Sequence, residues 1–289
     1  MKWRLYETAA RCLEQVGTSL ERREAENNLA LGILHSLAGG RPTGTLSAET
    51  LTAVVEDGGQ PVLALVMTPP MQLIMAGVAS GIVSSEAVQI AVEGLAALGA
   101  SVPGVVGEPE IAAAFAQAWE AKTGCSSETV MSQRIYRLDK VNEILRGPGD
   151  LRNAEEADTE LVARWIHDFS IDSREPVSYD TAVRKANDSI GESSLYLWEN
   201  DGKPVSMAKS ARPTRHGVVI SLVYTPPSLR GKGYATSCVT ALSQLLLDRG
   251  YRFCSLYTDL SNPTSNHIYQ NIGYRPVQDS VALRFVQSC

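Results

Sequence analysis

The stretch GVVISLVYTPPSLRGKGYATSCVTALSQLLLDRG, residues 217–250, carries the strongest structural signal in the chain. Its first nine residues are rich in β-branched side chains and predict a strand. The strand should end at Pro226-Pro227, because proline cannot donate to a strand ladder. From Thr236 to Asp248, apolar residues recur at three- and four-residue spacing, which predicts a helix. Between the two lies RGKGYA, residues 230–235, so the order is strand, glycine-rich turn and helix.

The glycine-rich turn has the features of an anion-binding site. Gly231 and Gly233 allow the backbone to approach a ligand closely, and the helix that follows offers unpaired N–H groups and the positive end of its dipole. The turn is not a Rossmann fingerprint, because Thr236 stands at the third glycine position. It is not a Walker A loop, because Lys232 is followed by glycine. Taken alone, the loop also fits a tight strand-to-helix turn that binds nothing.

Two motifs together resemble the GNAT acyltransferase superfamily. RGKGYA fits the pattern Arg/Gln-x-x-Gly-x-Gly/Ala, which holds the pyrophosphate of coenzyme A in that superfamily. LYTDLSNPTSNHIYQNIGYRPV at 256–277 is similar to its next strand and helix, in which an asparagine is followed seven residues later by tyrosine and then by Gly-Phe/Tyr. Here these are Asn262, Tyr269 and Gly273-Tyr274. The resemblance covers about residues 150–287 and implies an α/β (α+β) fold with a mixed, mostly antiparallel twisted sheet flanked by helices.

The resemblance implies that acetyl-CoA is the acyl donor and that no metal is needed. The backbone at the end of the strand would pair with the pantetheine arm, and the loop and first helical turn would donate N–H groups to the pyrophosphate. On this basis the expected cofactor-binding residues are Val223, Tyr224, Thr225, Arg230, Gly231, Lys232, Gly233, Tyr234, Ala235, Thr236, Asn262 and Ser265. Two of them have a simpler alternative, since an exposed Lys232 is often only solvated and Asn262 before Pro263 is also a plain helix N-cap.

Tyr269 is the residue to which the resemblance assigns chemistry. When an amine attacks the thioester carbonyl, the departing CoA thiolate needs a proton, and a phenol hydroxyl can supply it as a general acid. Ser265 lies four residues earlier and so shares a helix face with Tyr269. The alternative role for Tyr269 is that of an aromatic core residue that packs against Tyr274.

The sequence leaves the general base open. Several members of the superfamily carry a glutamate on the central strand, but here the corresponding positions are Val219 and Ser221. The other candidates lie near strand ends, on the Tyr269 helix and in an acidic segment, and they are Glu199, His216, His267 and residues 168–180.

The acceptor is expected to bind beside WIHDFSIDSREPVSYD, residues 165–180. Its acidic side chains suit a cationic amine, although a run of charges is usually just a solvated face. The leading hypothesis is direct transfer of an acetyl group to a primary amine of a small molecule or peptide. The alternative is a catalytically inactive, CoA-binding regulatory or sensor protein on the same fold.

Composition and charge argue against other classes of function. With 26 Lys and Arg against 32 Asp and Glu, the net charge of −6 does not favour nucleic acid binding. Five cysteines at irregular spacing and four scattered histidines give neither a disulfide framework nor a zinc pattern, which favours a cytoplasmic protein. The uncharged stretch 58–85 contains Pro69-Pro70 and is interpreted as two buried strands rather than a membrane span. We expect a monomer or a homodimer.

A chain of 289 residues is long enough for two domains. The breaker cluster RGPGD at 146–150 places the expected boundary between 1–147 and 148–289, after a helix expected from Leu138 to Leu145. In the first half, the patterns predict helices over 7–20, 21–37, 87–98 and 111–122 and strands over 52–55 and 62–67.

A short internal echo suggests that the two halves share one design. EDGGQPV at 56–62 matches ENDGKPV at 199–205, an offset of 143 residues. The match reflects either a duplication or the chance recurrence of a hairpin turn. AVQIAV at 87–92, which is equivalent to the glycine-rich loop, has no glycine. If the halves are duplicates, the first is therefore a degenerate GNAT-like copy that has lost the function of that loop.

Overall fold

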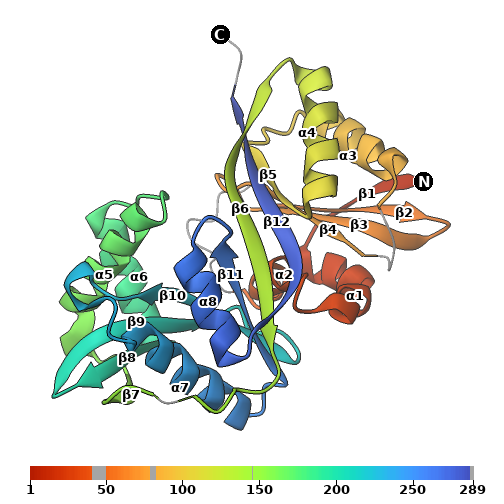
Figure 1. The fold of residues 1–289 in the computed structure, drawn as a ribbon. Coiled ribbons are helices and arrows are strands. Elements are labelled where there is room, and N and C mark those ends of the chain that lie inside the picture. The colour runs from red at the N-terminus through yellow and green to blue at the C-terminus, as the bar shows by residue number, and fades with distance from the viewer. Residues whose placement is uncertain (41–49, 79–82, 145, 287–289) are drawn as a thin grey trace. The chain divides into compact units, whose positions relative to one another are not determined.

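The chain forms two compact units (Figure 1). The computed structural model describes residues 1–40, 50–78, 83–144 and 146–286. Unit 1 consists of Met1–Ile135, Tyr257–Pro263 and the segment from Pro276 onward, and unit 2 consists of Tyr136–Leu256 and Thr264–Arg275. This division differs from the expected boundary at 147/148, because two late segments of the chain group with its N-terminal part.

One order of elements occurs twice along the chain: strand, two helices, three strands, helix, strand, helix and strand. The first pass is β1 (Lys2–Tyr6), α1 (Ala9–Leu20), the 3-10 helix η1 (Glu21–Arg23), α2 (Asn28–Ala38), β2 (Leu51–Asp57), β3 (Gln60–Met67), β4 (Leu73–Gly77), α3 (Ser85–Ala97), β5 (Gly104–Gly107), α4 (Pro109–Thr123) and β6 (Ser126–Leu138). The second pass is β7 (Asp150–Asn153), η2 (Glu156–Asp158), α5 (Thr159–Asp172), α6 (Tyr179–Gly191), β8 (Leu195–Asn200), β9 (Lys203–Ala211), β10 (Gly217–Tyr224), η3 (Pro227–Leu229), α7 (Tyr234–Asp248), β11 (Phe253–Asp259), α8 (Pro263–Ile272) and β12 (Arg275–Val286).

The first half contains most of the expected helices and strands, with several corrections. The helices expected at 87–98 and 111–122 are α3 and α4, whereas the helix expected at 21–37 is interrupted between η1 and α2. The strands β1, β5 and β6 were not predicted. The helix expected from Leu138 to Leu145 is wrong, because Leu138 ends β6 and residues 139–144 are not helical; residue 145 lies outside the described residues. From Tyr136 to Leu138, two buried residues flank a partly exposed one, and this period of two is that of a strand.

The uncharged stretch 58–85 contains two buried strands, as expected. They are β3 and β4, which pair antiparallel from Leu63 opposite Gly77 to Val66 opposite Ile74. Residues 79–82 of this stretch lie outside the described residues. In the described part of the chain, no helix combines the length and the apolar character that a membrane crossing requires.

Each unit is built on a largely antiparallel sheet. The strand order is β1-β2-β3-β4-β5-β12-β6 in unit 1, and in unit 2 it is β7-β8-β9-β10-β11 followed by the end of β6. The pairs β4–β5 and β10–β11 are parallel. The closing strand β12 pairs with β5, where Val281 lies opposite Gly107, and this pairing explains why the C-terminal segment groups with unit 1. The last strand of each pass therefore lies beside strands of the other pass.

The two passes also share an irregularity in their first hairpin. In β2–β3 the register shifts after Val55, so that Glu56 lies opposite Pro61. In β8–β9 it shifts after Trp198, so that Glu199 lies opposite Pro204. A chance recurrence of a turn would not be expected to repeat the bulge at the same place. The shared bulge therefore favours duplicated halves.

Helices cover both faces of each sheet (Figure 1). In unit 1, α3 and α4 enclose one core cluster, and α1 and α2 enclose another on the opposite face. In unit 2, α7 and α8 pack against Tyr196, Val218 and Ile220, and α5 and α6 pack against Leu197 and Met207. These layers leave the end of β10 between α7 and α5.

Candidate active site

The site expected from the sequence begins where β10 separates from β11. Their parallel ladder runs only from Gly217 opposite Phe253 to Val219 opposite Ser255, whereas β10 continues to Tyr224. On its other side, β10 bulges against β9, and Leu222 in the bulge has φ 49°. The backbone of Val223 and Tyr224 therefore lies beyond the ladder, on the side where an extended ligand could add as a strand.

A buried hydroxyl pair fixes the end of β10. The Ser206 hydroxyl on β9 is fully buried and donates to the carbonyl oxygen of Tyr224 at 3.0 Å. It also lies 2.9 Å from the hydroxyl oxygen of Thr225. Thr225 is one of the expected cofactor residues, but Ser206 was missed, because a serine inside a strand has no sequence signal that distinguishes it.

The glycine-rich loop leads directly into an uncapped helix. Gly231 and Gly233 have φ 78° and 79°, a conformation that other residues adopt only with strain. Gly233 is the N-cap of α7, whose first turn contains Tyr234, Ala235 and Thr236, and it provides no side-chain oxygen. The first N–H groups of α7 and its dipole can therefore serve an external anion. Lys232 is exposed beside them.

The corresponding helix of the first half begins differently. At α3 the N-cap is Ser84, whose hydroxyl accepts from the Ala87 N–H at 3.2 Å, and Glu86 lies in the first turn. The Ser84 hydroxyl occupies a backbone N–H group that a bound phosphate would need, and the Glu86 carboxylate repels anions. The described start of α3 is thus unsuited to a phosphate, which agrees with a first half that has lost this function.

Arg230 at the start of the loop turns its guanidinium away from α7. Its Nε donates to the Thr225 carbonyl oxygen at 2.9 Å, and its Nη2 donates to Oδ2 of Asp172 on α5 at 2.6 Å. Its Cζ lies 5.8 Å from the centre of the Tyr224 ring. Arg230 therefore connects the glycine-rich loop to α5.

The helix α8 carries the remaining expected residues. Asn262 directly precedes it, Ser265 lies in its first turn, and Tyr269 follows one turn later. The Tyr136 hydroxyl at the end of β6 donates to the Asn266 side-chain oxygen at 2.8 Å, and it accepts from Gln270 at 3.1 Å. These two contacts hold α8 against the sheet, and no sequence pattern predicted either of them.

Tyr269 is a buried side chain, 8% exposed, in the core cluster under α7 and α8. Its ring meets the Tyr274 ring edge-on at 6.0 Å, so the core packing considered as an alternative is present. Burial, with a smaller effect from Cys238, raises the pKa of Tyr269 to about 12. The phenol therefore keeps its proton through neutral pH, which is the state that a general acid requires.

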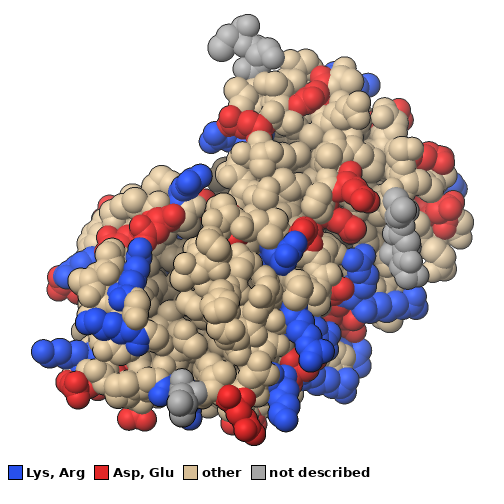
Figure 2. All heavy atoms as spheres, viewed as in Figure 1, with Lys and Arg blue, Asp and Glu red and all other residues tan. Residues whose placement is uncertain are grey.

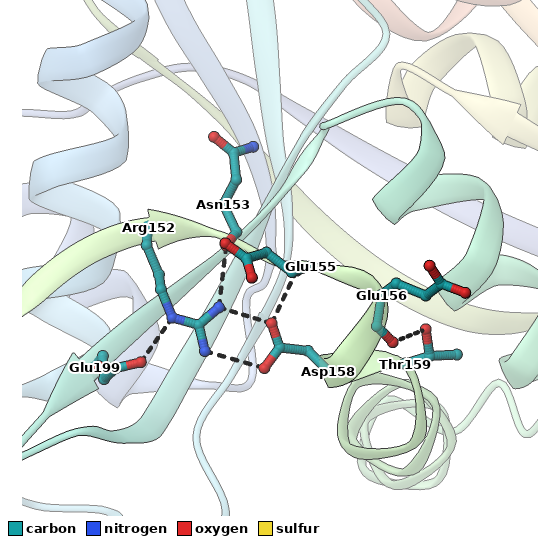
Figure 3. Close-up of polar contacts among 7 residues, drawn as sticks. All are labelled: Arg152, Asn153, Glu155, Glu156, Asp158, Thr159 and Glu199. Atoms are coloured by element: carbon teal, nitrogen blue, oxygen red, sulfur yellow. Dashed lines mark hydrogen bonds and ion pairs between the residues drawn. The ribbon is translucent and has the colours of Figure 1, made fainter.

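Glu199, a candidate base, is engaged elsewhere (Figure 3). Arg152 on β7 donates from Nε to Glu199 at 2.6 Å, and its two Nη atoms donate to Asp158 at 2.7 and 3.0 Å. Asp158 also accepts from the Glu155 N–H at 2.8 Å. The contacts of Arg152 raise its pKa, and the Arg152 hydrogen bonds lower the pKa of Asp158. Glu199 thus has a structural partner at the edge of the sheet.

The acidic segment includes two carboxylates on α5: Asp172 accepts from Arg230, and Asp168 lies 3.8 Å from Nδ1 of His167. Asp168 and Asp172 are four residues apart on α5 and so share a face. Desolvation is the main reason that the pKa of Tyr224 is raised, and the charges of these two carboxylates raise it further. His267, by contrast, lies 2.9 Å from the Asn271 amide on its own helix.

The described residues include no group of three or more His, Cys, Asp or Glu side chains that could hold a metal ion. Figure 2 shows Lys and Arg interspersed with Asp and Glu on the face in view, without a continuous positive surface there.

The residues 159–274 match the sequence model of the acetyltransferase (GNAT) family. This part of the chain is a GNAT acetyltransferase domain. Its span contains the separated strand, the glycine-rich loop and Tyr269. No curated protein matches the sequence.

Solved structures with a GNAT fold match the chain over nearly its full length. A GCN5-related N-acetyltransferase from Sphaerobacter thermophilus has a TM-score of 0.61 at 14% identity, covering 99% of this chain and 96% of that one. A GNAT acetyltransferase from Colwellia psychrerythraea has a TM-score of 0.57 at 12% identity and covers all of both chains. A tandem GNAT protein of the clavulanic acid biosynthesis pathway has a TM-score of 0.57 at 14% identity, covering 99% and 98%. This likeness concerns the fold, and it includes a GNAT-like first half.

Proposed function

We propose that this protein is an acetyl-CoA-dependent N-acetyltransferase that acts on a primary amine. The observation that carries the proposal is the uncapped N-terminus of α7, which follows two positive-φ glycines and lies next to a strand that has left its ladder. Together these features fit a ligand with an anionic group and an extended, amide-bearing arm, as coenzyme A has.

The residues assigned to the cofactor divide between its two parts. The backbone of Val223, Tyr224 and Thr225 would hold the pantetheine arm. The segment 231–236 would hold the pyrophosphate through N–H groups, and Lys232 would add a point charge. Asn262 and Ser265 would contact the cofactor from the start of α8.

Transfer would proceed by direct attack. The neutral amine nitrogen forms a bond to the thioester carbonyl carbon, and the C–S bond breaks as the tetrahedral intermediate collapses. The Tyr269 hydroxyl gives its proton to the departing sulfur, and the amine loses its extra proton to a base. Asp168 on α5 is the candidate for that base, since its charge acts on Tyr224 at the end of β10, whereas Glu199 is held by Arg152.

An acceptor screen tests the proposal. The purified full chain is incubated with acetyl-CoA and a panel of primary amines, free thiol is measured, and products are identified by mass spectrometry. Thiol release that depends on an amine, with an acetylated product of matching mass, is expected. Binding of acetyl-CoA without turnover on any amine would instead indicate a CoA-binding sensor, and failure to bind would overturn the cofactor assignment.

A further inference from the structure

The contacts of Arg230 join three elements of unit 2. Its guanidinium donates to Thr225 at the end of β10 and to Asp172 at the end of α5, while its own backbone begins the glycine-rich loop. The guanidinium is planar, so two hydrogen bonds and the nearby Tyr224 ring fix its orientation. A side chain held in this way transmits the position of the loop to α5.

Asp172 lies two residues after Ser170, whose hydrogen bonds hold the connection between α5 and α6. The Ser170 side chain is buried; its hydroxyl accepts from the Val177 N–H at 3.1 Å and donates to the His167 carbonyl oxygen at 2.6 Å. The Ser170 carbonyl oxygen accepts from the Glu175 N–H at 3.0 Å. These hydrogen bonds close the connection back onto the last turn of α5.

We propose that Arg230 is a positioning residue that couples the cofactor loop to the acceptor side of the site through Asp172. When a ligand occupies the segment 231–236, the loop becomes fixed; Arg230 then holds the end of α5, and the α5–α6 connection becomes ordered. This inference rests on the proposed function, because the ligand is coenzyme A. It assigns Arg230 a role through Asp172 rather than as a ligand of the pyrophosphate.

The coupling should be modest in size. Both side chains of the ion pair are 50% exposed, and solvent weakens such pairs. Hydrogen bonds from Arg230 to a backbone oxygen and to a carboxylate act together, which favours the upper part of the range for exposed pairs. We therefore expect effects of about two- to fivefold.

Amide hydrogen exchange with and without coenzyme A tests the coupling. In the unaltered protein, coenzyme A should slow exchange both at 231–236 and, by about two- to fivefold, at 173–178. In Asp172→Asn it should slow only 231–236. Asp172→Glu, which keeps the carboxylate, should restore the protection of 173–178. Glu160→Gln is the matched control, because it breaks the exposed Arg164–Glu160 pair (3.0 Å) on the same helix, and it should behave as the unaltered protein does.

The outcomes separate the two proposals. Protection of 173–178 that is the same in Asp172→Asn and in the unaltered protein would overturn the coupling and leave the proposed function intact. If coenzyme A protects only 231–236 in the unaltered protein, the coupling is likewise overturned and the proposed function stands. No protection of 231–236 by coenzyme A would overturn the cofactor assignment, and the coupling would fall with it.

Discussion

At the scale of single residues, the packing of Tyr269 can be separated by experiment from the general-acid role proposed for it. Its ring packs on Tyr274, and its burial keeps the hydroxyl protonated. Tyr269→Phe preserves the ring and removes only the proton donor, so we expect kcat to fall about 100-fold, a typical contribution of a general acid. The KM for acetyl-CoA and the midpoint of thermal unfolding should change little. Steady-state kinetics and calorimetry measure both, and a fall in kcat below threefold would show that Tyr269 only packs.

The pH dependence of the rate gives a second test of the same residue. A group that acts in its protonated form, with its pKa raised to about 12, loses activity only as the pH approaches that value. The rate should therefore rise with pH as the acceptor amine loses its proton, and it should show no decline up to pH 10 that depends on Tyr269. A decline near pH 8 that is absent in Tyr269→Phe would contradict this assignment.

Gly233 and Gly250 offer a matched pair of substitutions at the two ends of α7. Both have positive φ, 79° and 101°, and neither would bring an added Cβ within 4 Å of another atom. Gly233→Ala and Gly250→Ala should each cost about 1 kcal/mol of unfolding free energy, because of backbone strain alone. Only Gly233→Ala should raise the KM for acetyl-CoA, by about tenfold, since strain at Gly233 shifts the N–H groups that we propose bind the pyrophosphate. Equal KM values for the two variants would show that the N-terminus of α7 is not the anion site.

At the scale of elements, the sequence predicted the strand, loop and helix around residues 217–250, because local signals define each of them. The β-branched run, two glycines and the helical spacing act within a few residues of one another. Ser206 and Tyr136 could not be predicted in this way. Each touches the site through a partner far along the chain, Tyr224 or Asn266, and that partner is known only once the sheet register is known. The same reason explains the missed edge strand β1.

The hydrogen bonds of Arg152 to Glu199 and Asp158 connect β7 to the start of α5. Since the pKa of Asp158 is lowered in the folded state, its contribution to stability is present above the unfolded pKa and is lost as pH falls through the folded value. Asp158→Asn should cost about 2 kcal/mol at pH 7, the size of a charged hydrogen bond, and less below pH 3. Urea unfolding at several pH values measures this. Asp139→Asn, which affects the exposed Arg137 pair, is the control and should cost under about 1 kcal/mol at any pH. An equal cost of Asp158→Asn at pH 7 and pH 3 would contradict the network.

At the scale of the whole molecule, the two halves have the same order of elements but exchange their last strands. The strand β12 pairs with β5 of the first half, and β6 lies beside β11 of the second half. The sequence echo at 56–62 and 199–205 indicated two halves, and the shared hairpin bulge supports that interpretation. The exchange could not be predicted, because the patterns of β6 and β12 do not say which strands they pair with. Only long-range pairing, such as Val281 opposite Gly107, assigns them.

The exchange predicts that the GNAT domain needs a strand from the first half. A chain of residues 150–289 keeps every motif but loses Tyr136 and Leu138, which are fully buried in the core under α7 and α8. Loss of two such side chains costs on the order of 5 kcal/mol, which is comparable to the whole stability of a domain. A chain of residues 126–289 keeps β6 and is the matched control. We expect cooperative unfolding in urea for 126–289 but not for 150–289, and equal stability of the two chains would show that β6 is dispensable to the core that holds Tyr269.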